Sequence, residues 1–426
     1  MSQPTVPSED ERSRSGLLLQ MDIEHKKPVV SSSTGHRHQG SLETIVDFNH
    51  VPLTSSERTR GENIFDRILK VSAPAADSTL PFDTTKLLRI SLEEIPSEQG
   101  KDNFLNYVLR NHDPMEDDTE PRHFSQVLDS LEQVVPESSS QPPEWVASRS
   151  AELAKLLVYF FFLPLKGQAA KTPQPTPHLT PVGDGIHTPT LNRISKLRAT
   201  CLARDNHRCV ISGYFDQATA EDRESFVDDS NRPLTDGEIL VTEVAHIIPH
   251  ALGQSMHENA PLSSEKSKFW DVMKMFHPEM EHLLNGVEID RPFNAMTLTA
   301  DLHRSFGNLR WYLEEDSHQP KQHTYLFKDS PGVRARVNPM FRPRDEGERV
   351  QFVSANNTDL PEPGLLSLHR ACARILGLSG AGEYIDKLLR DDEKNRLGRC
   401  VPQLEQGQLD LAGIVSWRLA SFIKSA

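Results

Sequence analysis

The sequence predicts an α+β fold for the middle of the chain, with helical segments and disordered linkers on either side. Three observations support this class. A helical pattern over about residues 191–204 is followed by β-rich segments at 208–212, 239–248, 310–314 and 324–328. A helical insertion, residues 264–286, separates the second of these segments from the third. Outside the middle part, apolar residues recur at the three- and four-residue spacing of helices.

The first two segments of the chain differ in composition. Residues 1–60 are rich in Ser, Thr, Pro and charged residues and have no sustained period, so we expect them to be disordered. Residues 61–166 form a helical region, in which Phe124, Val127 and Leu128 have helical spacing. This region is either a small helical domain or a set of helices that pack on the core, and the sequence leaves both open.

The clearest boundary is a proline-rich linker over residues 167–190. Proline stands at positions 173, 175, 177, 181 and 189, and it removes a backbone donor and fixes φ. The α+β domain therefore extends over residues 191–330. A C-terminal helical region, residues 331–426, follows, with helices expected at 365–378 and 409–424.

Charge and hydropathy restrict the function classes. The net charge of −14 makes the chain a poor general binder of nucleic acid, so such binding requires a local basic patch. The longest apolar run, Leu156–Leu165, is too short to span a bilayer, contains Pro164 and is predicted to be a buried helix end. No membrane contact is expected.

The cysteines and the N-terminal sequence indicate the compartment. Cys201, Cys209, Cys372 and Cys400 form no C-x-x-C pair, which favours free thiols in a reducing environment over a zinc ribbon or a disulfide framework. The N-terminal residues contain no apolar core of a secretory signal. We expect an intracellular protein, nuclear or cytoplasmic.

The first candidate for chemistry is His246, in the segment VTEVAHIIPH. Strand-like residues lead to it and Pro249 ends the strand, so His246 lies at a strand terminus beside a loop. A neutral imidazole can accept a proton from water near physiological pH. A single histidine at such a place is more often an ordinary core or edge residue, so this segment alone decides nothing.

The second candidate segment is RPFNAMTLTADLHRSFGNLRWYLEE. Asn294 follows a proline and precedes an apolar run, and His303 comes later on a helix with Asp301 and Phe306. Together the two segments place a strand-end histidine, an asparagine and a helical histidine in order along the chain.

This combination resembles the HNH nuclease domain of the ββα-metal type, in the variety found in many uncharacterised fungal HNH proteins. The resemblance covers about residues 190–328. It rests on C-x-x-S-G from Cys209, the A-H-I-I-P strand, an insertion containing F-W, and F-G-x-L-x-W-Y-L-E from Phe306. It implies a ββα-metal core that carries the helical insertion.

The resemblance also implies roles for three residues. His246 would be the general base that deprotonates water, and Asn294 would hold the loop and orient that histidine. His303 would bind a divalent metal cation, Mg or Mn, which stabilises charge on the scissile phosphate. The expected activity is hydrolysis of phosphodiester bonds in nucleic acid, with DNA preferred to RNA.

The chain departs from the family at two positions where metal ligands usually stand. Ala245 precedes the base histidine, and Gly307 lies four residues after His303. Glu243 and Asp301 are candidate substitute ligands, although solvated carboxylates are the ordinary alternative for both. The histidines of the insertion and its neighbourhood have irregular spacing, and we expect them to be mostly solvated; they are His250, His257, His277 and His282.

The candidate basic patch lies on the helix at residues 191–204 and just beyond it. Its members are Arg193, Lys196, Arg204 and Arg208, which could contact phosphates. A solvated helix surface is the alternative.

Two functions remain open. One is a metal-dependent HNH endonuclease. The other is a degenerate HNH module that binds nucleic acid or a protein partner without cutting. The oligomeric state cannot be predicted from these residues.

Overall fold

The computed structural model describes residues 52–72, 80–115, 122–137, 143–169, 189–223, 226–253, 264–284, 286–318, 322–333, 336–345 and 347–398. Most of the predicted disordered segment and of the proline-rich linker lies outside these ranges. So do Cys400, His257 and the helix expected at 409–424.

The N-terminal helices begin at residues that cap them. The side chain of Thr54 accepts a hydrogen bond from the Glu57 backbone, and those of Asp83 and Ser97 cap the next helices in the same way. The first helix begins at Ser55, so the boundary that we predicted at residue 60 falls inside it. The helices are α2 (Ser55–Val71), α3 (Thr84–Glu94), α4 (Glu98–His112), α5 (Phe124–Val134) and α6 (Glu144–Leu157).

The apolar run at 156–165 is largely buried and contains the end of α6 at Leu157, as predicted, but the helical backbone continues beyond it. A π-helical turn, η2 (Val158–Phe162), passes directly into α7 (Leu163–Ala169). Pro164 has no backbone N–H, and a widened turn just before it accommodates the missing hydrogen bond.

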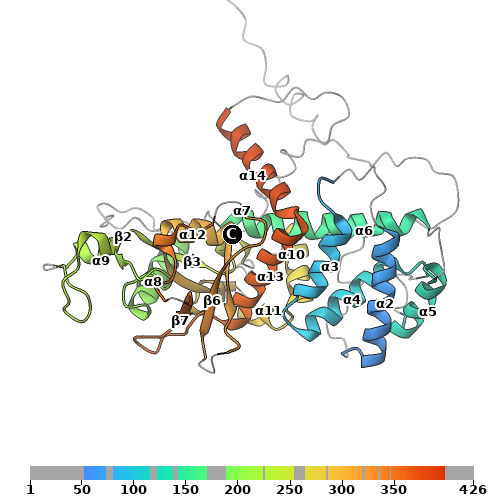
Figure 1. The fold of residues 1–426 in the computed structure, drawn as a ribbon, viewed down its shortest axis with the longest axis horizontal. Coiled ribbons are helices and arrows are strands. Elements are labelled where there is room, and N and C mark those ends of the chain that lie inside the picture. The colour runs from blue at the N-terminus through green and yellow to red at the C-terminus, as the bar shows by residue number, and fades with distance from the viewer. Residues whose placement is uncertain are drawn as a thin grey trace, which may run out of the picture. The chain divides into compact units, whose positions relative to one another are not determined.

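The middle of the chain has the predicted α+β composition, and its short elements surround two central strands. β3 (Thr242–His246) and β4 (Ala295–Thr299) pair antiparallel, with Thr242 opposite Thr299 and His246 opposite Ala295. The helix α12 (Ala300–Gly307) follows β4 directly, which completes a ββα unit. Figure 1 shows α12 beside β3.

The remaining elements precede, interrupt or follow this unit. β1 and β2 pair parallel, while β5, β6 and β7 form an antiparallel sheet. The elements are α8 (Pro189–Arg204), β1 (Phe215–Asp216), α9 (Gln217–Glu221), η3 (Asp236–Glu238), β2 (Ile239–Leu240), η4 (His250–Leu252), α10 (Ser264–Phe276), α11 (Met280–Leu283), η5 (Gly286–Asp290), η6 (Pro292–Asn294), β5 (Trp311–Glu315), β6 (Thr324–Asp329), η7 (Pro339–Phe341), β7 (Arg349–Gln351), α13 (Pro363–Ser379) and α14 (Ala381–Gly398).

The predicted β-rich segment at 208–212 is a turn, apart from a single bridge between Arg208 and Phe215. Gly213 has φ +75° and donates its N–H to the Cys209 carbonyl, so the chain reverses within a few residues. The segment predicted at 239–248 is divided at Val241 and ends at His246.

The helical region packs on the core, which settles the alternative that the sequence left open. One continuous apolar cluster contains residues from both parts. Phe161 of η2 stacks on Phe269 of α10, with ring centroids 5.3 Å apart, and lies 5.1 Å from Phe276. Gly100 allows α4 to approach α10, because a Cβ there would lie 2.3 Å from the Phe276 carbonyl oxygen. The insertion helix α10 is therefore a shared element of the two parts.

The helix α13, in the C-terminal helical region, holds the ββα helix α12 in place. His369 of α13 stacks on Phe306 of α12, with ring centroids 3.7 Å apart, and donates a hydrogen bond from Nε2 to the Phe306 carbonyl. Burial lowers the pKa of His369 to about 3, so the ring is neutral at physiological pH. α13 also contacts α3, where Glu94 pairs with Arg374 at 2.7 Å. Both flanks thus support the middle of the chain.

Phe161→Ala should destabilise the helical region and the ββα unit together. Removing this buried ring should cost about 3–5 kcal/mol, because its neighbours on α10 cannot collapse fully into the space. Urea unfolding followed by tryptophan fluorescence measures this loss, and Phe226→Ala is the control because Phe226 is exposed. A loss below about 1 kcal/mol for Phe161→Ala would contradict a shared core.

Candidate active site at the end of β3

The β3–β4 pair lies between α8 and α12. Val244 belongs to a small apolar cluster with Leu197 and Cys201 of α8, whereas the next residue, Ala245, belongs to the main core. Successive side chains of a strand point to opposite faces, so this alternation places the two helices on opposite faces. Glu243 lies two residues before Ala245, so its side chain points to the same face, where it contacts His303 of α12.

His246 is the last residue of β3, and its side chain is buried. Its Nε2 lies 3.1 Å from Oδ1 of Asp290, the last residue of η5. Burial lowers the pKa of His246, and the hydrogen bond to Asp290 only partly opposes this effect. The ring is therefore neutral at physiological pH.

Asp290 is held by three side chains. His250 Nδ1 lies 2.6 Å from the same Oδ1, and Arg193 Nε of α8 lies 3.0 Å from Oδ2. Burial by itself raises the pKa of the Asp290 carboxyl, but the hydrogen bonds from His246 and His250 outweigh it and hold the pKa well below its usual range. Asp290 is thus a buried carboxylate.

This pairing fixes the tautomer of His246. A carboxylate only accepts hydrogen bonds, so the single proton of the neutral ring lies on Nε2. The other nitrogen, Nδ1, is buried and has no hydrogen-bond partner among the described residues. It carries a free lone pair, which a proton acceptor needs.

Asn294 joins the loop after β3 to the segment that carries Asp290. Its Oδ1 accepts from the Ile248 backbone N–H at 2.9 Å. Its Nδ2 donates to the carbonyls of Ile248 at 3.0 Å and Ile289 at 2.8 Å. The side chain is fully buried, and its hydrogen bonds hold together the two loops on either side of His246.

His303 of α12 forms a second histidine–carboxylate pair. Its Nδ1 lies 2.6 Å from Oε2 of Glu243, and the hydrogen bond from His303 is the main cause that lowers the pKa of Glu243. Its Nε2 is buried without a hydrogen-bond partner in the described part of the chain. The charge of His303 also contributes to lowering the pKa of His246.

Of the three candidate metal ligands, His303 and Glu243 lie together, whereas no contact joins Asp301 to them among the described residues. Glu243 bonds to the Nδ1 side of His303, and the side chain of Asp301 is exposed. Within the described ranges, the group of potential ligands that converges consists of His246, His250 and Asp290, with ligand atoms within 4.8 Å of one another.

The prediction for His250 was wrong, because its ring is largely buried against Asp290 rather than solvated. His277 is buried too. Neither Asp290 nor His250 had a sequence signal beyond its nearness to Asn294 or His246.

The predicted basic patch is mostly occupied by internal pairs. Arg204 is fully buried and bonds to Asp205 and to backbone carbonyls, including that of Ala295. Arg193 pairs with Asp290, and Arg208 pairs with Asp228. Lys196 alone of the four predicted residues is exposed. The sequence pattern failed here because exposure depends on carboxylates that are distant in the chain.

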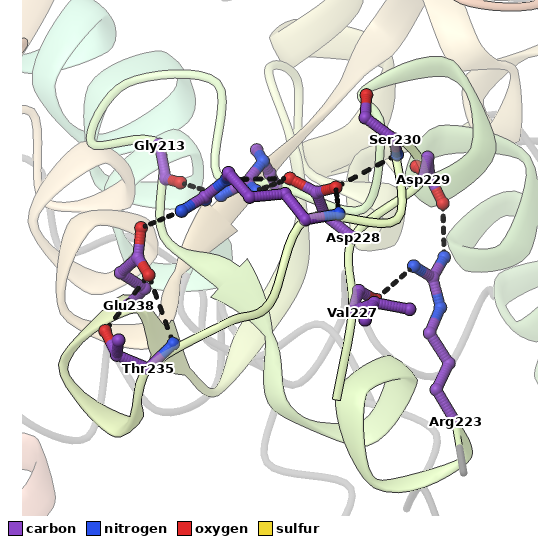
Figure 2. Close-up of polar contacts among 10 residues, drawn as sticks. Gly213, Arg223, Val227, Asp228, Asp229, Ser230, Thr235 and Glu238 are labelled. Carbon is purple, nitrogen blue, oxygen red and sulfur yellow. Dashed lines mark hydrogen bonds and ion pairs between the residues drawn. The ribbon is translucent and has the colours of Figure 1, made fainter. Parts of the chain in front are cut away.

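The loop that engages Arg208 is a dense polar network. Figure 2 shows Asp228 accepting from the Ser230 backbone, and Arg223 bonding to Asp229 and to the Val227 carbonyl. Glu238 accepts from the backbone and hydroxyl of Thr235. These carboxylates neutralise the arginines of the loop.

Unpaired arginines lie instead beside α12. Arg304, Arg310 and Arg390 are exposed and line a cavity of about 400 Å³. No ion pair joins these arginines to a described carboxylate, although Asp301 and Asp386 also line the cavity and Asp386 pairs with Lys166. Arg304 follows His303 directly, and its charge contributes to lowering the pKa of Glu243. The cavity is therefore lined by residues of α12, the helix that also carries His303.

Comparison with known proteins agrees with this geometry. Residues 209–314 match the model of a family described as HNH endonuclease. This part of the chain is an HNH nuclease domain, as its motifs predicted, and the α+β class with a ββα unit is confirmed. The family suggests nuclease-type activity and dependence on a metal. No curated protein and no solved structure matches the chain. Among the described residues, no helix is long and apolar enough to cross a membrane.

Asp290→Asn should lower the pKa of the His246 ring further. The carboxylate raises that pKa through its hydrogen bond and charge, and its loss leaves burial, which lowers the pKa, as the main cause. Nitrogen-15 NMR of histidine-labelled protein measures both pKa and tautomer, with His318→Ala as the assignment control for an exposed ring. An unchanged or higher pKa in a folded variant would show that Asp290 does not govern His246.

Proposed function

We propose that this chain is a metal-dependent endonuclease that hydrolyses phosphodiester bonds in DNA, with His246 as general base and His303 as metal ligand. One observation carries the proposal. Each of the two histidines has one ring nitrogen on a carboxylate and the other nitrogen buried without a described partner. Such orphaned nitrogens are costly unless a reactant or an ion engages them.

The residues around His303 fit a divalent cation. A metal-binding histidine commonly donates its other ring N–H to a carboxylate, which orients the ring and raises its basicity. Glu243 provides this carboxylate, so we reassign it from ligand to orienting residue and set Asp301 aside. When bound at His303 Nε2, Mg²⁺ or Mn²⁺ would stabilise the negative charge that builds on the phosphate.

The chain's own residues account for proton transfer. Nδ1 of His246 accepts a proton from a water molecule as its oxygen attacks phosphorus and a P–O bond breaks. Asp290 holds the ring in the required tautomer and stabilises the imidazolium that forms. Asn294 bonds to the loop after β3 and to the η5 segment, and these hydrogen bonds position His246 and Asp290 relative to each other.

A non-catalytic HNH module is the second candidate. Ala245 and Gly307 favour it, because both positions are buried and neither side chain offers a donor to a metal. In that case the two histidine–carboxylate pairs would be structural.

Phosphate binding beside α12 supports a nucleic-acid substrate. Arginine without a carboxylate partner is well suited to phosphate oxygens, because its planar donors can bind two of them. Arg304, Arg310 and Arg390 line a cavity beside α12, the helix that carries His303. We propose that the DNA backbone on one side of the scissile bond lies there, rather than on α8.

His246→Ala should lower the rate of plasmid nicking in Mg²⁺ or Mn²⁺ by about 10²–10⁴-fold, while DNA affinity stays nearly unchanged. His303→Ala should instead weaken metal affinity, and higher cation concentration should partly restore its activity. Glu243→Gln should also weaken metal affinity, by about 10–100-fold, because Glu243 acts by orienting His303.

His318→Ala is the matched control for these variants, since this histidine is exposed. If pure wild-type protein gives no nicking with either ion and no heat on calorimetric titration, the non-catalytic module is the better account.

Replacing both Arg310 and Arg390 with Ala should weaken binding to a DNA duplex. The slope of log affinity against log salt should flatten by about 1 for each arginine that contacts a phosphate. Fluorescence anisotropy at several salt concentrations gives this slope, and Lys196→Ala should leave it nearly unchanged. If Lys196→Ala flattens the slope and the double variant does not, DNA lies on α8. Tighter binding to an RNA duplex would argue for RNA as substrate.

A further inference from the structure

The side of His246 that faces away from its free nitrogen carries a convergent set of ligand atoms. His246, His250 and Asp290 each offer one ligand atom, and these atoms lie within 4.8 Å of one another. His246 Nε2 and His250 Nδ1 both contact the same Oδ1 of Asp290. The two histidines flank the turn at Pro249, and η5 brings the carboxylate to them. Sequence distance separates Asp290 from both, so the fold builds this group.

The donor set is that of a borderline transition metal. Two imidazoles and one carboxylate, with a fourth position for water, are a known combination for Zn²⁺. Mg²⁺ prefers oxygen ligands and retains its waters, so it is poorly matched to two ring nitrogens. The cation proposed at His303 therefore does not compete well for this position.

Burial and charge suit a bound cation. The side chains of His246 and Asp290 are 1% and 3% exposed, whereas that of His250 is 12% exposed and offers the approach from solvent. Arg193 holds the second oxygen of Asp290 and leaves Oδ1 directed at the two histidines. A carboxylate fixed in this way is pre-oriented as a ligand.

We propose that His246, His250 and Asp290 form a zinc-type transition-metal site, separate from the cation at His303, and that its occupation switches off the general base. Without a metal, the rings donate Nε2–H of His246 and Nδ1–H of His250 to Asp290. With a metal, these nitrogens supply lone pairs, so the neutral His246 ring carries its proton on Nδ1.

The switch follows from the position of that proton. Once a metal occupies Nε2 of His246, Nδ1 carries the ring proton and has no lone pair for a proton from water. The site itself is independent of catalysis, but its inhibitory effect rests on the proposed function of His246. The free state supports the reaction and the zinc-bound state blocks it.

Binding is tested on the full chain after removal of metals with a chelator. Zn²⁺ is titrated against a chromophoric chelator, and Co²⁺ is used as a spectroscopic probe of tetrahedral coordination. Wild-type protein should take up one ion at this site. His250→Ala and His250→Gln, both checked for folding by circular dichroism, should weaken uptake at least tenfold and abolish the Co²⁺ spectrum. His303→Ala and His318→Ala should retain both.

Each outcome separates the site from the nuclease. Uptake that is absent in wild type, or unchanged in folded His250 variants, overturns the site whatever the nicking results are. If zinc binds through these residues but the protein does not nick DNA, the metal site is supported and the proposed nuclease function is wrong. If the protein nicks DNA in Mg²⁺, stoichiometric Zn²⁺ should inhibit it and His250→Gln should resist inhibition. Equal inhibition of the wild type and of His250→Gln by Zn²⁺ would overturn the proposal that the bound metal switches off the general base.

Discussion

The buried carboxylate of Asp290 is the interaction on which the candidate site depends. It connects α8 through Arg193, the end of β3 through His246, and η4 through His250. A carboxylate removed from water is costly unless its oxygens are hydrogen-bonded, and here both oxygens have partners. The same contacts decide which nitrogen of His246 carries the proton. The Asp290 carboxylate therefore sets both the geometry and the protonation of His246 at the end of β3.

The regions outside the HNH domain determine how rigidly this site is held. α12 carries His303, and α13 holds α12 through the stack of His369 on Phe306. The insertion helix α10 packs on Phe161 and Phe104 of the N-terminal helices. Because these contacts belong to one apolar cluster, the ββα unit derives part of its stability from segments that lie outside the family match.

The sequence predicted what depends on local order along the chain. The strand ending at His246, the helix carrying His303 and the position of Asn294 between them follow from spacing and turn residues. Asp290 and His250 were missed because only tertiary structure brings them together. Arg204 was misjudged for a related reason, since its charge is cancelled by a neighbouring aspartate and by carbonyls from distant loops. A charge pattern alone cannot distinguish a solvated cation from one that is structurally engaged.

The departures at Ala245 and Gly307 affect the two halves of the proposed chemistry unequally. Neither residue contributes to the hydrogen bonds of His246, so the orientation of the proposed base does not depend on them. What is reduced is the number of side chains available to a cation near His303. The Glu243 carboxylate partly offsets this loss, because it makes the one remaining imidazole a stronger and better-oriented ligand. A site built in this way would bind its cation weakly and depend on the substrate phosphate to complete the coordination, which couples metal binding to substrate binding.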